Sequence, residues 1–341
     1  MNILVTGGAG YIGSHACKAL AAKGFLPITY DNISRGNRWA VKWGPFENGD
    51  IADPQRVRTI LEKYQPAAVM HFAASSLVGE SVVDPRKYYI NNVAGTLSLL
   101  EAMREADCNR LVFSSTGAVY GNAESKALPE SYDCAPVNPY GASKWMIERI
   151  LADYRGAHGL RSFALRYFNA SGAEASGGIG ELRDNETHLI PRAMMALQGH
   201  VTDFAVFGDD YDTPDGTAIR DYIHVTDLAA AHLLALDLLM QGDCGGTYNL
   251  GTGTGFSVRE VLATIAAETG REVPHVVKPR RSGDPAYLVA DPAAARKNLK
   301  FRPVYSDLAT IIRTAWAWHT KAHPLKAGER LPTGAGPSQV A

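Results

Sequence analysis

Residues 2–14, NILVTGGAGYIGS, decide the fold. The apolar run that begins this stretch predicts a short buried strand, and a G-x-x-G-x-x-G turn (Gly7, Gly10, Gly13) leads from it into helical periodicity at 11–23. A strand, a glycine turn and a helix N-terminus in this order let the backbone approach a pyrophosphate, whose charge the free N–H groups and the helix dipole favour. The spacing departs by one residue from the usual G-x-G-x-x-G, so a purely structural turn is the alternative. We expect a dinucleotide cradle.

A second apolar run, LPITYDN, ends in Asp31. This is about the distance downstream at which an acid accepts hydrogen bonds from the ribose hydroxyls in dinucleotide-binding folds. Because a carboxylate there would repel a 2′-phosphate, the sequence favours NAD over NADP. Arg35 and Arg38 nearby keep NADP open as an alternative.

Apolar runs alternate with helical periodicity through the first half of the chain. The runs lie at 2–6, 26–30, 67–73, 110–115 and 161–167, and the helical stretches near 11–23, 53–64, 85–106 and 140–157. This rhythm of β-α units predicts an α/β fold with a doubly wound, Rossmann-type parallel sheet. Residues 1–168 are therefore expected to form an NAD-binding domain.

Beyond residue 169 the pattern loosens into short helices and loops. Helices are expected near 187–198, 226–240, 257–269 and 306–319, with a strand at 203–207. We expect residues 169–324 to form a smaller mixed α/β substrate domain, with some segments interleaved with the first domain. Residues 325–341 lack periodicity and are expected to be a disordered tail.

The composition indicates a small-molecule partner. The 341 residues contain 34 Lys and Arg against 35 Asp and Glu, without a run of like charge, so neither nucleic acid nor a membrane surface is an expected partner. The four cysteines are scattered, and no export signal or long apolar segment is visible, which favours reduced thiols and a cytoplasmic location. The ten histidines show no metal-ligand spacing, so no metal is expected.

The predicted helix at 85–106 has apolar residues on more than one face. Helix pairing in a homodimer would cover the extra apolar face. A helix buried deeply within one chain is an equally good explanation.

Tyr140 precedes Lys144 by four residues in NPYGASK. On a helix this spacing sets the two side chains on one face, about 5–6 Å apart at Cβ, so the ammonium can favour the phenolate and lower the tyrosine pKa. Tyr140 is thus a candidate general base, with an exposed aromatic beside a solvated charge as the alternative. Thr116 follows the fourth apolar run, where its hydroxyl can lie between that phenol and a substrate hydroxyl; a turn-forming threonine is the alternative there.

Longer motifs make a family resemblance specific. The chain resembles the extended short-chain dehydrogenase/reductase family over about residues 1–320, in HFAASSLVGESVVDP, YYINNVAGT, NPYGASK, LRYFNASGA, FGDDYDTPDGTAIRDYIHVTDLA and RRSGDP. It is most similar to the NAD-dependent members that invert the 4-hydroxyl of a UDP-hexose. The sister 4,6-dehydratases typically carry an Asp-Glu pair after the threonine, whereas this chain has Gly117 and Ala118, so dehydration is not expected.

The resemblance implies two sets of contacts. NAD would be lined by Gly7, Gly10, Tyr11, Ile12, Gly13, Asp31, Asn32, Asp50, Ile51, Phe72, Ala73, Asn91, Tyr140, Lys144 and Phe168. The UDP-sugar would meet Thr116, Tyr140, Asn169, Leu189, Ala205, Phe207, Arg220, Arg281, Asp284 and Leu288, with the two arginines on the phosphates and ribose. Ser76 stands where many of these enzymes have a lysine, so one cofactor contact is in doubt.

The expected activity is the interconversion of UDP-glucose and UDP-galactose through a 4-keto sugar, with catalysis by Tyr140, Lys144 and Thr116. Leu288 occupies a position that in the family limits room for a 2-acetamido group, so tolerance of UDP-GlcNAc stays open. UDP-xylose or a UDP-uronate is the alternative substrate. A remote alternative is an NAD-sensing regulator without catalysis.

Overall fold

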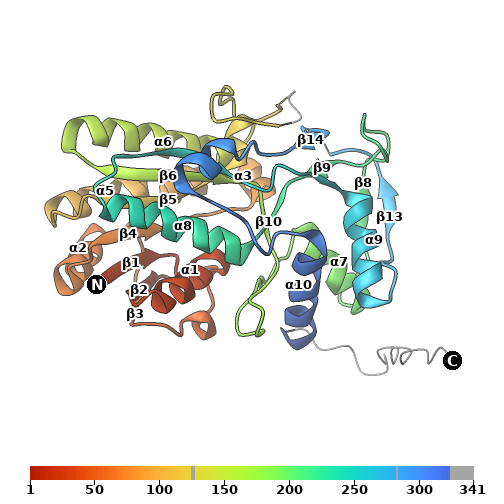
Figure 1. Ribbon diagram of the computed structural model, residues 1–341, viewed down its shortest axis with the longest axis horizontal. Helices are drawn as coiled ribbons and strands as arrows, with labels where there is room; N and C mark the ends of the chain where they lie inside the picture. Colours follow the sequence, from red (N-terminus) through yellow and green to blue (C-terminus); the bar gives the residue numbers. More distant parts are fainter. Residues whose placement is uncertain (124–126, 282, 323–341) are drawn as a thin grey trace.

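The computed structural model describes residues 1–123, 127–281 and 283–322, so the tail expected at 325–341 lies outside the described residues. A seven-stranded sheet runs through the larger lobe (Figure 1). Its strands are β1 (Asn2–Thr6), β2 (Leu26–Asp31), β3 (Phe46–Asn48), β4 (Ala68–His71), β5 (Arg110–Thr116), β6 (Arg161–Tyr167) and β11 (Gly245–Leu250). They lie in the order β3-β2-β1-β4-β5-β6-β11 and every pairing is parallel, which confirms the doubly wound α/β fold.

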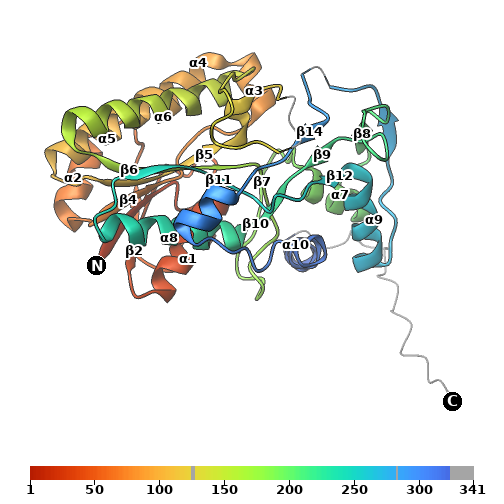
Figure 2. The same ribbon diagram turned by 45° about the horizontal axis from the view of Figure 1, so that its top comes forward.

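Helices cover both faces of this sheet (Figure 2). One face carries α1 (Tyr11–Ala22), α8 (Val225–Met240) and η4 (Ala295–Leu299), and the other carries α2 (Pro54–Tyr64), α5 (Gly95–Glu105) and α6 (Pro139–His158). Because both faces are buried, the central strands are nearly continuous apolar runs, and this is why the sequence identified them.

The stretch expected as one helix at 85–106 is built in three pieces. It consists of α4 (Pro85–Tyr88), the π-helical stretch η2 (Tyr89–Ala94) and α5, preceded by the unpredicted helix α3 (Val78–Val83). Within η2, the amide of Asn92 donates to Ser75 O and to Ser143 Oγ, both at 3.0 Å. A π-helical turn widens the helix locally and is common at functional sites.

Helix α6 begins and ends with strong local signals. Asn138 accepts a hydrogen bond from Gly141 N at 2.8 Å and Pro139 fills the first turn. Gly159, at φ 68°, ends the helix in the left-handed conformation that glycine adopts most easily. These signals place the first turn of α6, with Tyr140, beside the end of β5.

The smaller lobe lies to the right in Figure 1 and has its own core. Its helices are α7 (Leu189–Leu197), α9 (Val258–Thr269) and α10 (Leu308–Ala322). Its short strands pair as β10 (Tyr222–His224) with β7 (Asn169–Ser171), β13 (Val276–Lys278) with β8 (Ala205–Phe207), and β12 (Phe256–Ser257) with β9 (Ile219–Arg220) and β14 (Tyr287–Leu288). Helix α8 and strand β11 belong to the layers of the large sheet, although they come from the second half of the chain.

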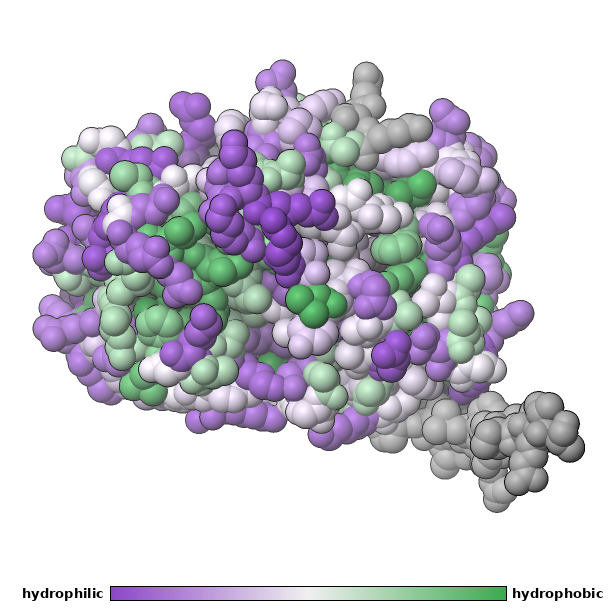
Figure 3. Space-filling view, in the orientation of Figure 1, coloured by the Kyte–Doolittle hydropathy of each residue, from purple (hydrophilic) through white to green (hydrophobic). Residues whose placement is uncertain are grey.

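The face drawn in Figure 3 mixes polar and apolar residues. Hydrophilic residues gather near its middle, over the short helix η4 that packs beside α8. Among the described residues, no helix combines the length and the apolar character needed to cross a bilayer.

Candidate active site

The strand order reverses between β1 and β4, and dinucleotides bind at the carboxyl ends of the strands at such a point in doubly wound folds. Gly7 has φ 72°, and a Cβ on it would lie 2.5 Å from Ala73 N. A Cβ on Gly13 would lie 2.2 Å from Gly7 O. Only glycines allow the turn to pack this closely against the end of β4 and the first turn of α1.

The N-terminus of α1 is open to an anion. Its N-cap is Gly10, which offers no side chain to the first N–H groups of the helix. Asp31 at the end of β2 accepts from Ala9 N at 3.0 Å and from Ile33 N at 2.8 Å, and so ties the glycine turn to the next strand. Burial raises the pKa of the Asp31 carboxyl, against these two hydrogen bonds. The turn therefore fits the pyrophosphate of a dinucleotide.

The other expected cofactor residues gather along the same edge of the sheet. Asn32, Asp50, Ile51, Phe72, Ala73 and Phe168 follow the ends of β2, β3, β4 and β6, and Asn91 lies in η2. Asn32 Nδ2 donates to Asp50 Oδ2 at 2.7 Å, which joins the loops after β2 and β3. Two elements that the sequence did not predict, β3 and η2, thus position residues of this group.

Thr116 and Tyr140 meet at the neighbouring strand end. Thr116 is the last residue of β5, and its side chain lies by the Tyr140 phenol and acts to lower the pKa of that phenol. The Thr116 Oγ1 also accepts a hydrogen bond from Ala118 N at 3.1 Å. The ring of Tyr88 lies edge-on to that of Tyr140, with centroids 6.4 Å apart. The structure therefore brings together the two residues expected to relay and accept a proton.

Lys144 is buried one turn further along α6, at 3% exposure. Its Nζ donates to Ser114 O at 2.8 Å and lies 4.7 Å from the centre of the Phe113 ring. Burial lowers the pKa of Lys144 to about 7, against the opposing charge of Glu148. Its charge at neutral pH is therefore finely balanced.

The expected lowering of the Tyr140 pKa is wrong for the chain on its own. Burial raises the pKa of Tyr140, because a phenolate loses its hydration there, while the Thr116 hydrogen bond and the charge of Arg183 act in the lowering direction. The Lys144 ammonium donates its hydrogen bond to Ser114 O rather than to the phenol. Besides Thr116 and Arg183, the positive charge of an oxidised nicotinamide would favour the phenolate.

Arg183 was not predicted as a site residue. It lies in the crossing loop, which we define as residues 172–188 between β7 and α7, and the sequence gave no spacing that could place such a loop. The crossing loop reaches back to the NAD-binding lobe, where Tyr11 OH donates to Gly172 O at 2.6 Å and Asn37 Nδ2 donates to Leu182 O at 3.2 Å. It thereby brings a guanidinium to the catalytic edge.

Gly117, next to Thr116, has no room for a larger side chain. A Cβ there would lie 2.7 Å from the Phe168 ring. The acidic residue that dehydratases carry at this place would displace that ring. This packing agrees with the expectation that the chain does not eliminate water.

Five of the expected substrate residues come together in the smaller lobe. Arg220 and Asp284 form an ion pair, and the Arg281 guanidinium lies 4.0 Å from the centre of the Phe207 ring. Leu288 pairs with Arg220 in the β14/β9 ladder. Two guanidiniums, one of them over an aromatic ring, suit a nucleoside diphosphate.

The other expected substrate residues border this group less directly. Asn169 lies in β7, and its Nδ2 donates one hydrogen bond to Asp221 O at 2.9 Å, so the amide oxygen and the second N–H are left for a ligand. Leu189 opens α7 and Ala205 opens β8, and both are partly buried. The sequence motif identified the position of Asn169 without revealing its backbone partner.

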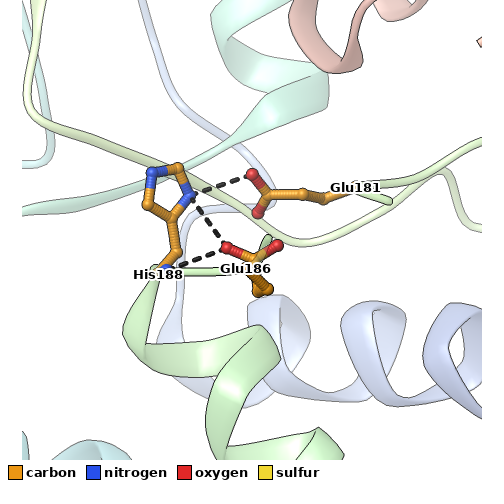
Figure 4. A group of neighbouring side chains, drawn as sticks. All are labelled: Glu181, Glu186 and His188. Carbon is orange, nitrogen blue, oxygen red and sulfur yellow. Dashed lines mark hydrogen bonds and ion pairs between the residues drawn. The ribbon is translucent and has the colours of Figure 1, made fainter. Parts of the chain in front are cut away.

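Two carboxylates and an imidazole form a cluster at the end of the crossing loop (Figure 4). Glu181 Oε1 lies 2.9 Å from His188 Nδ1 and also accepts from Arg183 Nε at 2.8 Å, while Glu186 Oε1 accepts from two backbone N–H groups. The charge of Glu181 raises the pKa of His188, and His188 and Arg183 hold the pKa of Glu181 below its usual range despite its burial. A divalent cation would compete with the Arg183 guanidinium for the same oxygen, so the donor set suits a proton better than a metal. The absence of a metal stays a prediction.

Comparison with known proteins gives consistent results over most of the chain. Residues 3–251 match the NAD dependent epimerase/dehydratase family. A UDP-glucose 4-epimerase of Rhizobium meliloti (strain 1021) is 52% identical over 320 residues, which are 94% of this chain and 97% of that protein.

Two solved structures are similarly close. A UDP-glucose 4-epimerase from Brucella ovis in complex with NAD has a TM-score of 0.91 at 56% identity, covering 92% of this chain and 97% of that one. A UDP-glucose-4-epimerase from Stenotrophomonas maltophila with bound NAD and formylated UDP-arabinopyranose has a TM-score of 0.92 at 40% identity, covering 94% and 98%. The chain described here belongs to the NAD dependent epimerase/dehydratase family.

Proposed function

We propose that the chain is an NAD-dependent isomerase that interconverts UDP-glucose and UDP-galactose by inverting the sugar 4-hydroxyl. The observation that carries this proposal is that Thr116, Tyr140 and the buried Lys144 meet at the carboxyl end of β5, at the sheet edge that also holds the glycine turn. Relatives named as UDP-glucose 4-epimerases, which the chain matches over nearly its whole length, support the choice of substrate.

When bound beside the glycine turn, NAD would supply the acceptor and donor of a hydride for the sugar C4. Tyr140, as the phenolate, takes the proton of the 4-hydroxyl directly or through Thr116, and the sugar becomes a 4-ketone. Tyr140 then returns the proton to the oxygen when hydride arrives on the opposite face of C4. Lys144 holds positive charge behind this exchange, and the burial of Lys144 with the partial burial of Tyr140 limits access of water to the proton transfer.

Inversion requires the ketone to turn within the site. Arg220 and Arg281 are suited to hold the diphosphate end by paired N–H donors, and the Phe207 ring is suited to pack beside the base. A firmly held nucleotide and a loosely held hexose allow C4 to present either face. Catalysis then leaves NAD unchanged after each turnover.

Deuterium labelling tests this proposal. UDP-galactose that carries deuterium at C4 is to be incubated with the purified protein, without added NAD, and the products analysed by mass spectrometry. We expect UDP-glucose that keeps the deuterium at C4, because the hydride is transferred and returned within one site. Absence of UDP-glucose would refute the activity, and exchange of the label with solvent would refute the mechanism.

The range of substrates is a separate proposal. Leu288 packs against the apolar cluster of Val119, Tyr120, Ala123 and Leu128, as Phe168 does. Its intermediate size supports activity on UDP-glucose and UDP-galactose with partial tolerance of UDP-GlcNAc. Equal rates on UDP-GlcNAc and UDP-glucose would show that the tolerance is full, and a faster reaction on UDP-xylose would favour the pentose alternative.

A homodimer in the cytoplasm remains our expectation. The large side chains Val82, Val83, Ile90 and Met146 are 63%, 86%, 46% and 44% exposed on α3, η2 and α6, a group we call the α3/α6 patch. A second copy of the chain would cover these apolar side chains.

The four cysteines, none of them in a disulfide, agree with a reducing compartment.

A further inference from the structure

Three residues of α6, one helical turn apart, each meet one of the last three residues of β5. The contacts are the Tyr140 phenol with Thr116, Lys144 Nζ with Ser114 O at 2.8 Å, and Glu148 Oε1 with Ser115 Oγ at 2.5 Å. The spacing of i, i+4 and i+8 sets all three side chains on the face of the helix that contacts the strand. The first two residues belong to the expected catalytic set, whereas Glu148 has no assigned role.

Glu148 is held by Arg166 of β6 in a buried, two-pronged ion pair. The two side chains are 4% and 5% exposed. Arg166 Nε donates to Glu148 Oε1 at 2.9 Å, and Arg166 Nη2 donates to Oε2 at 2.5 Å. A planar guanidinium bound in this way fixes both the position and the orientation of the carboxylate.

Two aromatic residues, Tyr120 and Trp145, in turn fix the Arg166 side chain. Arg166 Nη1 donates to Tyr120 OH at 2.8 Å, and the guanidinium lies 5.0 Å from the Tyr120 ring and 5.8 Å from the Trp145 ring. Tyr120 OH donates in turn to Asn249 Oδ1 at 2.7 Å, and Asn249 Nδ2 donates to Leu128 O at 2.7 Å. The network thus ties α6 to β5, β6 and β11.

A buried ion pair is an inefficient way to gain stability, because the cost of removing two charges from water offsets their attraction. Apolar side chains of similar volume would hold α6 on the sheet as well. What the pair adds is directional contact and a negative charge one turn from Lys144. Burial lowers the pKa of Lys144, and Glu148 is the charge that opposes this effect.

We propose that Glu148 and Arg166 are positioning residues for the proton transfer: they fix α6 against the end of β5 so that Tyr140 lies at Thr116, and they set the balance of charge around Lys144. This inference rests on the proposed epimerase function. It goes beyond that function by naming the residues that position Tyr140 and Lys144 and that set the charge around them.

Other titratable groups face this network from every neighbouring element. They are His71 of β4, Tyr88 of α4, Tyr120 of η3 (Gly117–Tyr120), Glu130, Tyr132 and Cys134 of the following loop, Tyr167 of β6 and Arg183 of the crossing loop. Burial lowers the pKa of His71 to about 3 and raises that of Tyr120 to about 12, so both stay neutral between pH 6 and pH 9. Shifts of the pH profile of kcat between pH 6 and pH 9 therefore report mainly on the Tyr140–Lys144 pair.

The test compares charge-changing variants by their pH profiles of kcat on UDP-galactose. Glu148→Gln keeps the shape but removes a negative charge, so every proton near it is lost more easily. We expect kcat to fall about tenfold or more with KM within about threefold, and the bell-shaped profile to move about 0.5 to 1 unit toward lower pH. Arg166→Met removes a positive charge and should move the profile toward higher pH.

Two further variants separate charge from geometry. Arg166→Lys keeps the positive charge but loses the two-pronged contact with Glu148, so kcat should fall while the pH profile of kcat stays in place. Ser115→Ala removes one hydrogen bond and no charge, and should give a smaller loss of kcat, also without a shift. A purely structural role would lower the amount of folded protein without moving the profiles in opposite directions.

The outcomes are distinguishable. If the unaltered protein fails to convert UDP-galactose, the proposed function fails. If it is active and Glu148→Gln matches it in kcat and profile, or loses kcat with the profile unmoved, only this inference is overturned. If Glu148→Gln does not fold, Arg166→Lys and Ser115→Ala decide: unchanged kcat in both, with bound NAD retained, overturns the inference.

Discussion

Among single residues, Lys144 shows most clearly that a group needed for function can lower the stability of the fold. Its ammonium is almost fully buried, and its main hydrogen-bond acceptor is the neutral Ser114 carbonyl oxygen. An uncompensated buried cation destabilises a fold. The chain retains it where a phenolate is needed, which is the pattern expected of a functional group rather than a packing residue.

Replacing this lysine should stabilise the fold in a pH-dependent way. An unfolded lysine has a pKa near 10.5 and the folded one about 7. Between these values the unfolded chain binds more protons, so the stability of the native protein rises with pH, and below pH 7 the full burial cost is present. We expect Lys144→Met to raise the free energy of unfolding by on the order of a few kcal/mol at pH 6, with the difference shrinking toward pH 10.

Urea unfolding at pH 6 and pH 9, at equal cofactor content, measures this effect. Lys23→Met is the matched control, since Lys23 is 61% exposed and should show little change at either pH. Destabilisation of Lys144→Met at pH 6 would contradict the burial argument. The variant should also be nearly inactive.

Thr116 is predicted to contribute less than the tyrosine. Thr116→Val keeps the volume but removes the hydroxyl that acts to lower the pKa of the Tyr140 phenol. We expect kcat to fall by about 10- to 100-fold with bound NAD retained, because a positioned hydroxyl adds to proton transfer without being its acceptor. An unchanged kcat would remove Thr116 from the mechanism.

Sequence reasoning identified site residues where a spacing or a strand end carried the signal. The i, i+4 pattern gave Tyr140 and Lys144, and the end of an apolar run gave Thr116. Continuing the same pattern by one turn would have reached Glu148. Arg183 had no such signal, because only the path of the crossing loop brings it near Tyr140.

The crossing loop is the element on which retention of the cofactor should depend. Three contacts join residues 172–188 to the larger lobe. Lys18 forms an ion pair with Glu174, Asn37 Nδ2 donates to Leu182 O, and Lys42 Nζ donates to Gly178 O at 2.8 Å. These contacts hold the loop beside α1, next to the glycine turn. A cofactor that is regenerated in every cycle has no need to leave, and such a loop would slow its release.

Loosening the loop should therefore release NAD. We expect the combined variant Lys18→Ala, Asn37→Ala and Lys42→Ala to lose about half or more of its NAD during gel filtration, because three polar contacts worth about 0.5–1.5 kcal/mol each are removed. Absorbance of the nucleotide freed by denaturation measures the retained fraction. Gln55→Ala on the exposed face of α2 is the control, and equal retention in both would contradict the role of the loop.

Among the elements, the long ones were predicted well and the short ones were not. Helix α6 and the strands β1, β5 and β6 have strong periodicity, buried apolar runs or clear caps. Strand β3 has three residues, and β11 begins at a glycine and carries few fully buried residues, so neither gives a strong pattern. The interruption by η2 depends on the tertiary contacts of Asn92, which the local sequence does not reveal.

At the scale of the whole molecule, the regular β-α rhythm predicted the large sheet, whereas the smaller lobe required the structure. Its strands have two or three residues and pair across long sequence separations, as β13 does with β8. The chain also returns from the smaller lobe to add α8 and β11 to the large sheet. Such a return depends on long-range packing, so local patterns cannot place it.

The α3/α6 patch predicts the behaviour of the molecule in solution. We expect light scattering after gel filtration to give about twice the chain mass of 36.7 kDa. Ile90→Glu with Met146→Glu should give the single-chain mass, since two charges would be buried in the contact. Val304→Glu, at a 72% exposed position outside the patch, is the control. A single-chain mass for the unaltered protein would contradict the homodimer.

The measurement that tests the central claim most directly is the turnover of Tyr140→Phe. The phenol at Thr116 is proposed as the acceptor of the substrate proton, so its loss should lower kcat on UDP-galactose by about 10²- to 10⁴-fold, while NAD is retained at the level of the unaltered protein. A variant that keeps its NAD and turns over UDP-galactose at the original rate would contradict the account.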